Sequence, residues 1–464
     1  MVNEKLYFFR QFSRSIATVG SFIPTSRFAA HAMVSEMARR TGPRRILEVG
    51  PGTGPITAEI VRHMRPDDSL VLCELNGDFV AFLADRMATD PTFAARRSQI
   101  TLQHANVQDL DADDRFDFII SAIPFVNCPP EVVESILAYY RTVLKPDGVL
   151  SFIEFAYLRA VRLKMMSLDA REQAEAAIAV MARDVDSHVF RRDLVIRNVP
   201  PAWVRHLRFV PPDPVDALNL TPLDHTQRIW LGDGAGLASA AVPLISVALG
   251  LGWVFRHARG APLVAWLAAA GVAAFFRDPP RKVVPDPRVA FAAADGTVLS
   301  VEEVDDDRFG AGRWLRIAVF LSITDVHINR APIAGLIVDS LDTAGHYAHA
   351  GTPAAEHNHA RYTVIDGAAG RCVVAQRVGA VARRIVTWTR VGELVSQGER
   401  YGLICFGSRT DVYVAADQWT ACVQAGERVV GGISPLARRS DGAPRSTAPR
   451  TDTGSSPPTP STTG

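Results

Sequence analysis

Residues 44–57 read RRILEVGPGTGPIT, and this segment is the most informative about the fold of the amino-terminal half of the chain. It opens with an apolar strand, residues 46–49, and three glycines follow at alternate positions: Gly50, Gly52 and Gly54. Glycines let a backbone turn tightly and approach a ligand closely. A second apolar run, SLVLCELN, reaches Glu74, whose carboxylate can accept hydrogen bonds from both hydroxyls of a ribose. Strands alternate with helical patterns up to about residue 210, which predicts a parallel α/β sheet.

Three details distinguish this loop from a site for a nicotinamide dinucleotide. Glu48 precedes the glycines, where a nicotinamide-binding loop usually has an apolar residue, and the spacing is GxGxG instead of GxGxxG. The segments ITLQHANVQDL, RFDFIISAIPF and LKPDGVLSFIEF then follow in order. This series resembles the successive motifs of class I methyltransferases. The resemblance implies a Rossmann-like fold that binds S-adenosyl-L-methionine, with Glu48, Glu74 and the glycines around the ligand and Asn106 beside the adenine.

The two ends of this region resemble a narrower family. The segments GSFIPTSRFAAHAM (20–33) and RNVPPAWVRHLR (197–208) look like the opening and closing segments of bacterial phosphatidylethanolamine N-methyltransferases. The resemblance covers nearly all of residues 1–210 and implies a phospholipid amine as the methyl acceptor. It departs at Ala122 and Ile123, where that family has Gly-Leu before the Pro-Phe pair.

RNA adenine is the main rival acceptor, because RNA dimethyltransferases share much of this architecture; a small metabolite is a further alternative. RNA dimethyltransferases stack the base on an Asn-Pro-Pro-aromatic segment, whereas Ser121 begins the segment here and no basic run accompanies it. For an amine acceptor, the enzyme aligns a nitrogen lone pair with the methyl group and excludes water. Glu154 and Tyr157, at the end of the LSFIEFAY strand, are candidates for the base that deprotonates the amine.

Three short segments in the second half indicate a different chemistry. They read AAADGTV (292–298), LSITDVHINRAPIAG (321–335) and GERYGLICFGSRTDVYV (398–414). Together, after FFRDPPR and with VGAVARRIV between the last two, they resemble the short form of phosphatidylserine decarboxylase. The resemblance runs over residues 237–437. It implies a compact β-rich domain, which the short alternating runs beyond Asp278 also favour.

The resemblance implies that the chain cuts itself between Gly407 and Ser408. Ser408 Oγ attacks the carbonyl of Gly407, because glycine leaves that carbonyl unshielded and tolerates a strained turn. A hydroxyl nucleophile needs a base, and the base needs an orienting acid. By resemblance, His327 is the base and Asp295 orients it. Ser408 then becomes a pyruvoyl group, which accepts the electrons released as carbon dioxide leaves the substrate.

Self-cleavage would leave chains 1–407 and 408–464 as partners of each other. Long-form relatives carry a second histidine three residues before the base, where Thr324 stands here, so the proton donor after decarboxylation stays open. No external cofactor or metal is implied for this reaction. Four further histidines lie in a loop-rich stretch without metal-binding spacing on a predictable helix, and we expect no metal there: His346, His349, His357 and His359.

The chain of 464 residues is long enough for two or three domains. We expect a methyltransferase domain over residues 1–210, a linker over 211–236, a decarboxylase domain over 237–437 and a disordered tail over 438–464. The tail has almost no large apolar residues. The formal net charge is only +1, which gives no field for bulk binding of nucleic acid. The five scattered cysteines form no CxxC pair and fit a reduced, cytosol-facing location.

Two apolar stretches, residues 240–255 and 261–276, flank a basic RHARG turn. The second is short against the roughly 20 apolar residues of a spanning helix. Two spans would also move the basic turn to the far side, against the positive-inside tendency. We therefore expect an apolar helical hairpin over 240–276 that enters one leaflet, with a buried helical pair as the alternative. Residues 1–20 place basic and aromatic side chains on separate arcs of a helix, which suits either a membrane interface or packing on its own domain.

Decarboxylation of phosphatidylserine yields phosphatidylethanolamine, the substrate of the inferred methyltransferase. Linked sites would act in sequence on the cytoplasmic face of the cell membrane, with the chain attached peripherally or by the hairpin. A membrane-attached scaffold with a degenerate catalytic half is the alternative from another class. The intact set of Asp295, His327, Gly407 and Ser408 argues against it. Relatives of the decarboxylase self-associate, which implies a homodimer.

Overall fold

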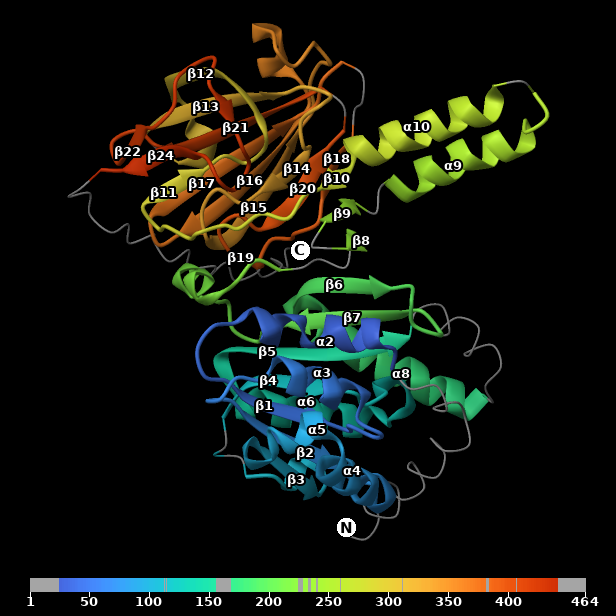
Figure 1. The fold of residues 1–464 in the computed structure, drawn as a ribbon. Helices are drawn as coiled ribbons and strands as arrows, with labels where there is room; N and C mark the ends of the chain where they lie inside the picture. The colour runs from blue at the N-terminus through green and yellow to red at the C-terminus, as the bar shows by residue number, and fades with distance from the viewer. Residues whose placement is uncertain are drawn as a thin grey trace, which may run out of the picture.

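The computed structural model describes residues 25–111, 113, 115–155, 168–223, 228–232, 235–238, 241–258, 260–310, 312–380, 384–405 and 407–440. Figure 1 shows an α/β domain and a β-rich domain lying against each other, with two helices projecting from the β-rich domain. The helix expected in residues 1–20, the candidate base Tyr157 and residues 441–464 of the expected tail lie outside the described residues. The first residues of that tail were predicted wrongly, because Arg438 and Arg439 belong to strand β24 Pro435–Arg439.

A mostly parallel sheet forms the centre of the α/β domain. Its strands are β1 Arg45–Val49, β2 Ser69–Glu74, β3 Ile100–His104, β4 Phe116–Ser121, β5 Leu144–Phe155, β6 Val189–Val195 and β7 Ala202–Leu207. They form one seven-stranded sheet in the order β3-β2-β1-β4-β5-β7-β6. Strands β1 to β5 pair in parallel, and β7 runs antiparallel to both of its neighbours. The carboxyl ends of β1 to β4 therefore meet at one edge, where ligands bind in such folds.

Helices cover both faces of this sheet, because its strands are apolar on both sides. On one face α2 Arg27–Arg39 and α3 Pro55–His63 pack against Ile46, and on the other α6 Pro130–Val143 and α8 Leu168–Asp184 pack against the region of Leu47. The remaining helical segments are α4 Gly77–Thr89, α5 Pro91–Ala94, η1 Arg97–Gln99, η2 Val107–Asp109, η3 Phe125–Asn127 and η4 Asp186–His188. The Rossmann-like α/β prediction is confirmed.

An antiparallel sheet dominates the second domain. Its strands are β12 Gly296–Asp305, β13 Arg313–Leu321, β15 Gly335–Thr343, β16 Ala360–Gly367, β17 Gly370–Arg377, β19 Leu394–Val395, β21 Ser408–Ala415 and β23 Arg428–Val429. They form an eight-stranded sheet in the order β19-β15-β16-β17-β21-β13-β12-β23. Strand β21 thus lies near the middle, between β17 and β13. This agrees with the expected β-rich domain.

Three smaller sheets and two 3₁₀ segments complete this half of the chain. Their members are β8 Arg228–Gly232, β9 Ala235–Ala238, β10 Arg277–Asp278, β11 Val289–Phe291, β14 Ile328–Arg330, β18 Ile385–Thr387, β20 Arg400–Ile404, β22 Trp419–Ala421, β24 Pro435–Arg439, η6 Asp307–Phe309 and η7 Pro353–His357. The sheet orders are β10-β9-β8, β11-β24-β22 and β14-β20-β18. Strand β20 leads directly toward the Gly407–Ser408 bond at the start of β21.

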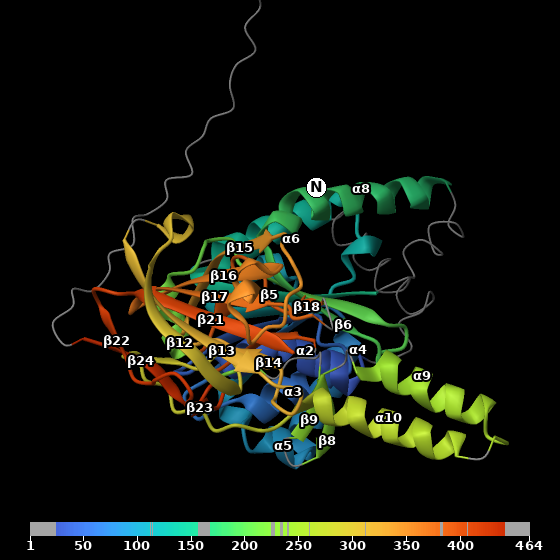
Figure 2. The same cartoon turned by 90° about the horizontal axis from the view of Figure 1, so that it is seen from above.

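The two apolar stretches form helices α9 Ala241–Val254 and α10 Ala261–Phe275, which pack along each other. A side chain at Gly252 would place its Cβ 2.5 Å from that of Ala265, so glycine permits the close approach of the helices. Figure 2 shows the pair extending away from the rest of the molecule. Among the described residues, no helix combines the length and the apolarity needed to cross a bilayer.

The expected linker contains a short structured element, η5 Pro214–Asn219. Ala217 and Leu220 form a small apolar cluster with Leu394 of the β-rich domain. Leu220 also pairs with Arg40, at the end of α2. The segment between the two domains is therefore packed against both of them.

Candidate active sites

The glycine loop in the α/β domain turns from β1 into α3 at the carboxyl edge of the sheet. The backbone angle φ is +70° at Gly50, +57° at Gly52 and +79° at Gly54, a region that side chains with a Cβ rarely adopt. Nothing lies within 4 Å of the position that a Cβ at Gly52 would take. The loop therefore has the backbone shape and the open space that a closely approaching ligand needs.

Glu48 lies directly before this loop and is fully buried. Neither of its carboxylate oxygens has a hydrogen-bond partner among the described residues. Burial raises the pKa of Glu48 to about 8, the nearby Thr57 opposes this rise, and the charge of Glu74 adds to it. An unsatisfied buried carboxyl is costly unless a ligand completes it, and a cationic group would favour its ionised form. S-adenosyl-L-methionine carries such groups, so Glu48 fits that ligand.

Glu74 and Asn106 hold neighbouring loops at the same edge. Glu74, at the end of β2, accepts hydrogen bonds from the backbone N–H groups of Gly52 at 3.0 Å and Asn76 at 2.9 Å. Asn106, after β3, accepts one from the N–H of Gln108 at 3.2 Å. Ser121, at the end of β4, accepts one from the Tyr140 hydroxyl at 3.0 Å. The structure thus brings the glycines, Glu48, Glu74 and Asn106 to one edge of the sheet.

The candidate base Glu154 is engaged elsewhere in this domain. Its carboxylate forms an ion pair with Arg205 at 2.6 Å, across the pairing of β5 with β7. The geometry therefore gives Glu154 a structural partner, and the base of the methyltransferase stays unassigned.

In the β-rich domain, Gly407 and Ser408 form the turn that opens β21. Gly407 has a φ of +65°, and the space beside its Cα is open to at least 4 Å. Ser408 is fully buried and its Oγ has no hydrogen-bond partner among the described residues. It pairs with Leu321 of β13, so the serine is held at the first residue of a strand in the middle of the sheet. An unpartnered buried hydroxyl beside an unshielded carbonyl fits the proposed source of a pyruvoyl group.

His327 lies against the strand that leads into this turn. Its backbone carbonyl accepts a hydrogen bond from the N–H of Ile404 at 3.4 Å, and its ring contacts that of Phe275 at a tilt of 38°, with centroids 4.2 Å apart. Its Nδ1 lies 3.0 Å from the carbonyl oxygen of Asp325. A carbonyl oxygen can only accept, so Nδ1 carries the hydrogen and Nε2 keeps its lone pair.

Burial lowers the pKa of His327 to about 4, so the imidazole is neutral near pH 7. Its Nε2 is buried and has no partner within the described part of the chain. His327 therefore has the protonation state and the free nitrogen of a general base. Thr324, which stands where long-form relatives have a histidine, binds Ser322 through its hydroxyl at 3.0 Å.

Asp295 has partners other than His327. Its carboxylate binds Arg281 through two contacts of 2.6 and 2.7 Å and the N–H of Gly431 at 2.8 Å. Asp295 lies close enough to favour the protonated form of His327 electrostatically, although burial of the ring outweighs this effect. The expected hydrogen bond from the imidazole to the Asp295 carboxylate is not made among the described residues; the carboxylate accepts from Arg281 instead.

Sequence reasoning missed Asp325, whose backbone carbonyl orients His327. The Asp325 side chain accepts a hydrogen bond from Ser322 Oγ at 2.7 Å and from Arg428 Nη2 at 2.6 Å. These contacts hold the turn that carries the carbonyl. The segment SITDVHINR shows an aspartate two residues before the histidine. The contact with His327 is made by the backbone of that aspartate, however, and a backbone acceptor cannot be recognised from a sequence.

One cluster of three possible metal ligands occurs among the described residues: His31, Glu59 and His63. Glu59 Oε1 lies 3.0 Å from His31 Nδ1 and 3.2 Å from His63 Nε2. Its other oxygen binds Arg62, so the carboxylate already has three partners. The four histidines of residues 346–359, all described, form no such cluster.

Comparison with known proteins adds two family matches. Residues 269–437 match the model of the family phosphatidylserine decarboxylase, and residues 46–148 match that of a methyltransferase domain. The phosphatidylserine decarboxylase proenzyme of Symbiobacterium thermophilum is 39% identical over 218 residues, covering 46% of this chain and 98% of the relative. The corresponding proenzyme of Carboxydothermus hydrogenoformans is 36% identical over 177 residues, covering 38% and 83%.

Solved structures of methyltransferases are also similar to part of this chain, at low sequence identity and low TM-score. An O-methyltransferase from Bacillus cereus in complex with S-adenosylhomocysteine is 14% identical and has a TM-score of 0.31. The aligned region covers 44% of this chain and 90% of that one.

Proposed function

The chain belongs to the phosphatidylserine decarboxylase family through its carboxyl-terminal part, and from this premise we propose that it converts phosphatidylserine into N-methylated phosphatidylethanolamine in two steps. The chain carries a decarboxylase domain and a methyltransferase domain. The decarboxylase releases an ethanolamine lipid, and the methyltransferase adds methyl groups from S-adenosyl-L-methionine to its nitrogen. The product of one domain is thus the substrate of the other.

Self-processing at Ser408 prepares the decarboxylase. His327 Nε2 takes the proton of Ser408 Oγ, the oxygen attacks the Gly407 carbonyl, and the proton passes to the departing Ser408 nitrogen, so that an amide becomes an ester. Loss of the Ser408 Cα proton then expels the Gly407 carboxylate and breaks the chain. Water replaces the remaining nitrogen, which leaves as ammonia, and a ketone is formed. When present, this pyruvoyl group binds the substrate amine and accepts the electrons released with carbon dioxide.

The main support for self-processing at Ser408 is that two buried reactive atoms have no partners and lie on segments that approach the same turn, at Gly407 and Ser408. They are Ser408 Oγ and His327 Nε2. Buried polar atoms are mostly hydrogen-bonded, and a catalytic role is one reason for an exception. The sheet also supports retention of the second fragment, because β21 is paired on both sides with β13 and β17. We expect the two chains to stay associated after cleavage.

The methyltransferase domain binds its donor at the carboxyl edge of the α/β sheet. Glu48 meets a cationic part of S-adenosyl-L-methionine, the loop at Gly52 lies against it, and Glu74 receives the ribose hydroxyls. Domain pairing supports a lipid acceptor, since the adjoining domain makes phosphatidylethanolamine. The chain itself aligns the amine with the methyl group and excludes water.

Replacing Gly52 with alanine is expected to weaken binding of S-adenosyl-L-methionine by about tenfold or more, because a Cβ would occupy the space for the ligand. Gly42→Ala is the matched control: Gly42 also has a positive φ, +82°, and nothing lies within 4 Å of its Cβ position. It precedes β1, at the opposite end of the strand from the ligand edge. Titration calorimetry on the full chain measures both variants, and equal losses would contradict the proposed site.

The helical pair attaches the protein to a phospholipid membrane. Large apolar side chains at the far end of α9 and α10 are 56–68% exposed: Trp253, Val254, Phe255, Leu263, Val264 and Trp266. Exposed apolar clusters of this kind, with aromatic rings, suit a membrane interface. The near end of the pair reaches His327 through Phe275. Insertion of the pair would therefore bring the decarboxylase site to the lipid head groups of the cytoplasmic leaflet.

Replacing Leu263 with aspartate is expected to lower binding to phosphatidylserine-containing vesicles by about tenfold, because a charge near the hairpin tip opposes insertion. Leu263 is 65% exposed, and Ile196, at 72%, is an equally exposed apolar residue on the α/β domain. Ile196→Asp is therefore the control and should leave binding unchanged. Cosedimentation with vesicles measures both, and equal binding of Leu263→Asp and the unaltered protein would contradict membrane attachment through the hairpin.

A vesicle assay tests the proposed function. The purified full chain is incubated with phosphatidylserine vesicles and methyl-labelled S-adenosyl-L-methionine, and the lipids are extracted. We expect label in N-methylated phosphatidylethanolamine. One parallel reaction contains total RNA. Another contains vesicles of phosphatidylethanolamine, a lipid that can be methylated without the decarboxylase step. Label in RNA with none in lipid would assign a different acceptor, and phosphatidylserine left unchanged would contradict the decarboxylase step.

A further inference from the structure

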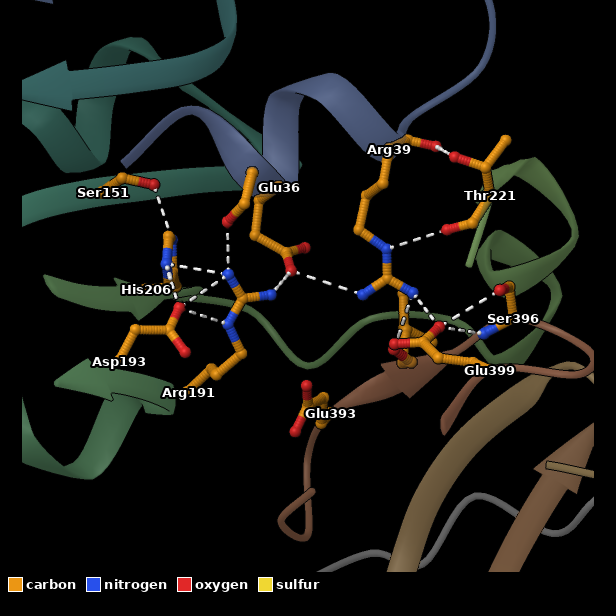
Figure 3. A network of polar contacts seen from close by, with 12 residues as sticks. Glu36, Arg39, Ser151, Arg191, Asp193, His206, Thr221, Glu393, Ser396 and Glu399 are labelled. Carbon is orange, nitrogen blue, oxygen red and sulfur yellow. Dashed lines mark hydrogen bonds and ion pairs between the residues drawn. The ribbon is translucent and has the colours of Figure 1, made fainter. Parts of the chain in front are cut away.

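A buried network of charged groups crosses the boundary between the two domains (Figure 3). The α/β domain contributes Glu36 and Arg39 from α2, Arg191 and Asp193 from β6, and His206 and Arg208 at the end of β7; the β-rich domain contributes Glu393 and Glu399. None of these side chains is more than 7% exposed. Charges this deeply buried need partners, and here the partners come from both domains.

Arg39 makes the direct link. Its guanidinium lies 3.3 Å from Glu36 Oε1 within its own helix and 2.5 Å from Glu399 Oε2 of the other domain. It also donates to the carbonyl of Leu394 at 3.4 Å. Figure 3 shows the Arg39 side chain extending from α2, with Glu36 and Arg191 on one side of it and Ser396 and Glu399 on the other. Arg39 is thus a cation that the α/β domain supplies to Glu399 of the β-rich domain.

Burial and the neighbouring arginines shift the pKa values of the glutamates in this network. Burial opposes ionisation of Glu36, but Arg39, Arg191 and Arg208 outweigh it and lower its pKa to about 2. Burial raises the pKa of Glu393 to about 8, and its Oε1 has no partner among the described residues. Burial also raises the pKa of Glu399, against the charge of Arg39, which lowers it. The network thus places three arginines among four buried carboxyl groups from the two domains.

Glu399 also connects this network to the segment that leads to the Gly407–Ser408 bond. Its carboxylate accepts hydrogen bonds from the N–H of Ser396 at 2.8 Å and from the Ser396 hydroxyl at 3.1 Å. Its backbone carbonyl accepts one from the N–H of Ala331 at 2.8 Å, beside β14. Strand β20 begins at Arg400, directly after Glu399, and pairs with β14, which begins directly after His327. It then runs toward Ser408.

We propose that the methyltransferase domain positions the decarboxylase for self-cleavage, through the ion pair between Arg39 and Glu399. Arg39 fixes the turn before β20, and β20 in turn holds the Gly407 carbonyl in reach of Ser408 and His327. Arg39 is thus a positioning residue for a reaction in the other domain. This inference rests on the proposed self-cleavage at Ser408. The fusion then joins the two domains structurally as well as by their sequence of reactions.

Pulse-labelled synthesis of the full chain in a cell-free system tests this proposal, by following the conversion of the intact chain to fragments. Arg39→Met is expected to slow cleavage roughly ten- to a hundredfold, because small displacements of reacting groups cost rates of this size. Glu399→Gln, which keeps an acceptor for Ser396, should slow it as well. The double variant removes both charges together and should recover to within about threefold of the unaltered rate.

Arg183→Met is the matched control, because Arg183 pairs with Glu134 on the exposed surface of the same domain, with side chains 63% and 47% exposed. It should cleave at the unaltered rate. Single variants that cleave normally, or a double variant in which the two effects simply add, would overturn the proposal. If Arg39→Met loses cooperative thermal unfolding, Glu399→Gln decides alone: slowing supports the proposal and a normal rate overturns it. An unaltered chain that never cleaves contradicts the proposed processing itself.

Discussion

Replacing Ser408 with alanine is expected to leave the protein as one chain and to abolish decarboxylation. The methyl group of alanine cannot form the ester, so neither the chain break nor the ketone can arise. Ser408 is fully buried at the start of β21, and alanine fits that space without disturbing the sheet. Denaturing electrophoresis should show fragments 1–407 and 408–464 for the unaltered protein and a single band for the variant.

Ser300→Ala is the control for this experiment. Ser300 is a partly buried serine in β12 of the same domain and takes no part in the proposed reaction. That variant should be cut and should decarboxylate phosphatidylserine normally. Binding of S-adenosyl-L-methionine should be unchanged in both variants, which checks that the chain has folded. Two fragments from Ser408→Ala would show that another bond is broken.

Replacing His327 with glutamine is expected to slow self-cleavage by about 10²- to 10⁴-fold, the usual contribution of a general base. Glutamine can still donate a hydrogen bond to the Asp325 carbonyl, but it offers no basic nitrogen to the serine. His357→Gln serves as the control, because His357 is exposed on η7. The rate of fragment formation after pulse-labelled synthesis measures the effect.

The dependence of cleavage on pH provides a second measure of the same residue. Burial holds the pKa of His327 near about 4, so the reactive neutral form predominates above that value and is lost as the pH falls through it. The rate should therefore stay flat between about pH 5.5 and 8 and decline only in stronger acid. A rate that rises through pH 6 to 7, as for an exposed histidine, would contradict the buried base.

Much of the fold follows from patterns that lie close together in the sequence. The apolar run before Gly50 specifies a strand buried on both faces, and the positive φ values at Gly50, Gly52 and Gly54 match the need for glycine there. The apolar stretches on either side of RHARG likewise become α9 and α10. These features depend on local spacing, which a sequence displays directly.

The features that the sequence did not predict depend on distant side chains. Arg39 and Glu399 are 360 positions apart, and neither has a local pattern that announces an ion pair. Asp295 looks like a partner for His327 by residue type, yet Arg281 occupies its carboxylate. The acceptor for His327 is instead the backbone of Asp325, which any residue could supply. Packing of the whole chain, not residue type, decides such contacts.

Mass spectrometry of the mature full-length protein shows whether the Gly407–Ser408 bond is cut and whether Ser408 has become a ketone. We expect a fragment 408–464 whose first residue lacks the nitrogen of serine and carries a ketone, together with fragment 1–407. Reduction with borohydride should add two hydrogens to that ketone and shift the mass of the short fragment accordingly. An unbroken chain with an ordinary serine at position 408, in a preparation that decarboxylates phosphatidylserine, would show that the activity does not come from a pyruvoyl group made at Ser408.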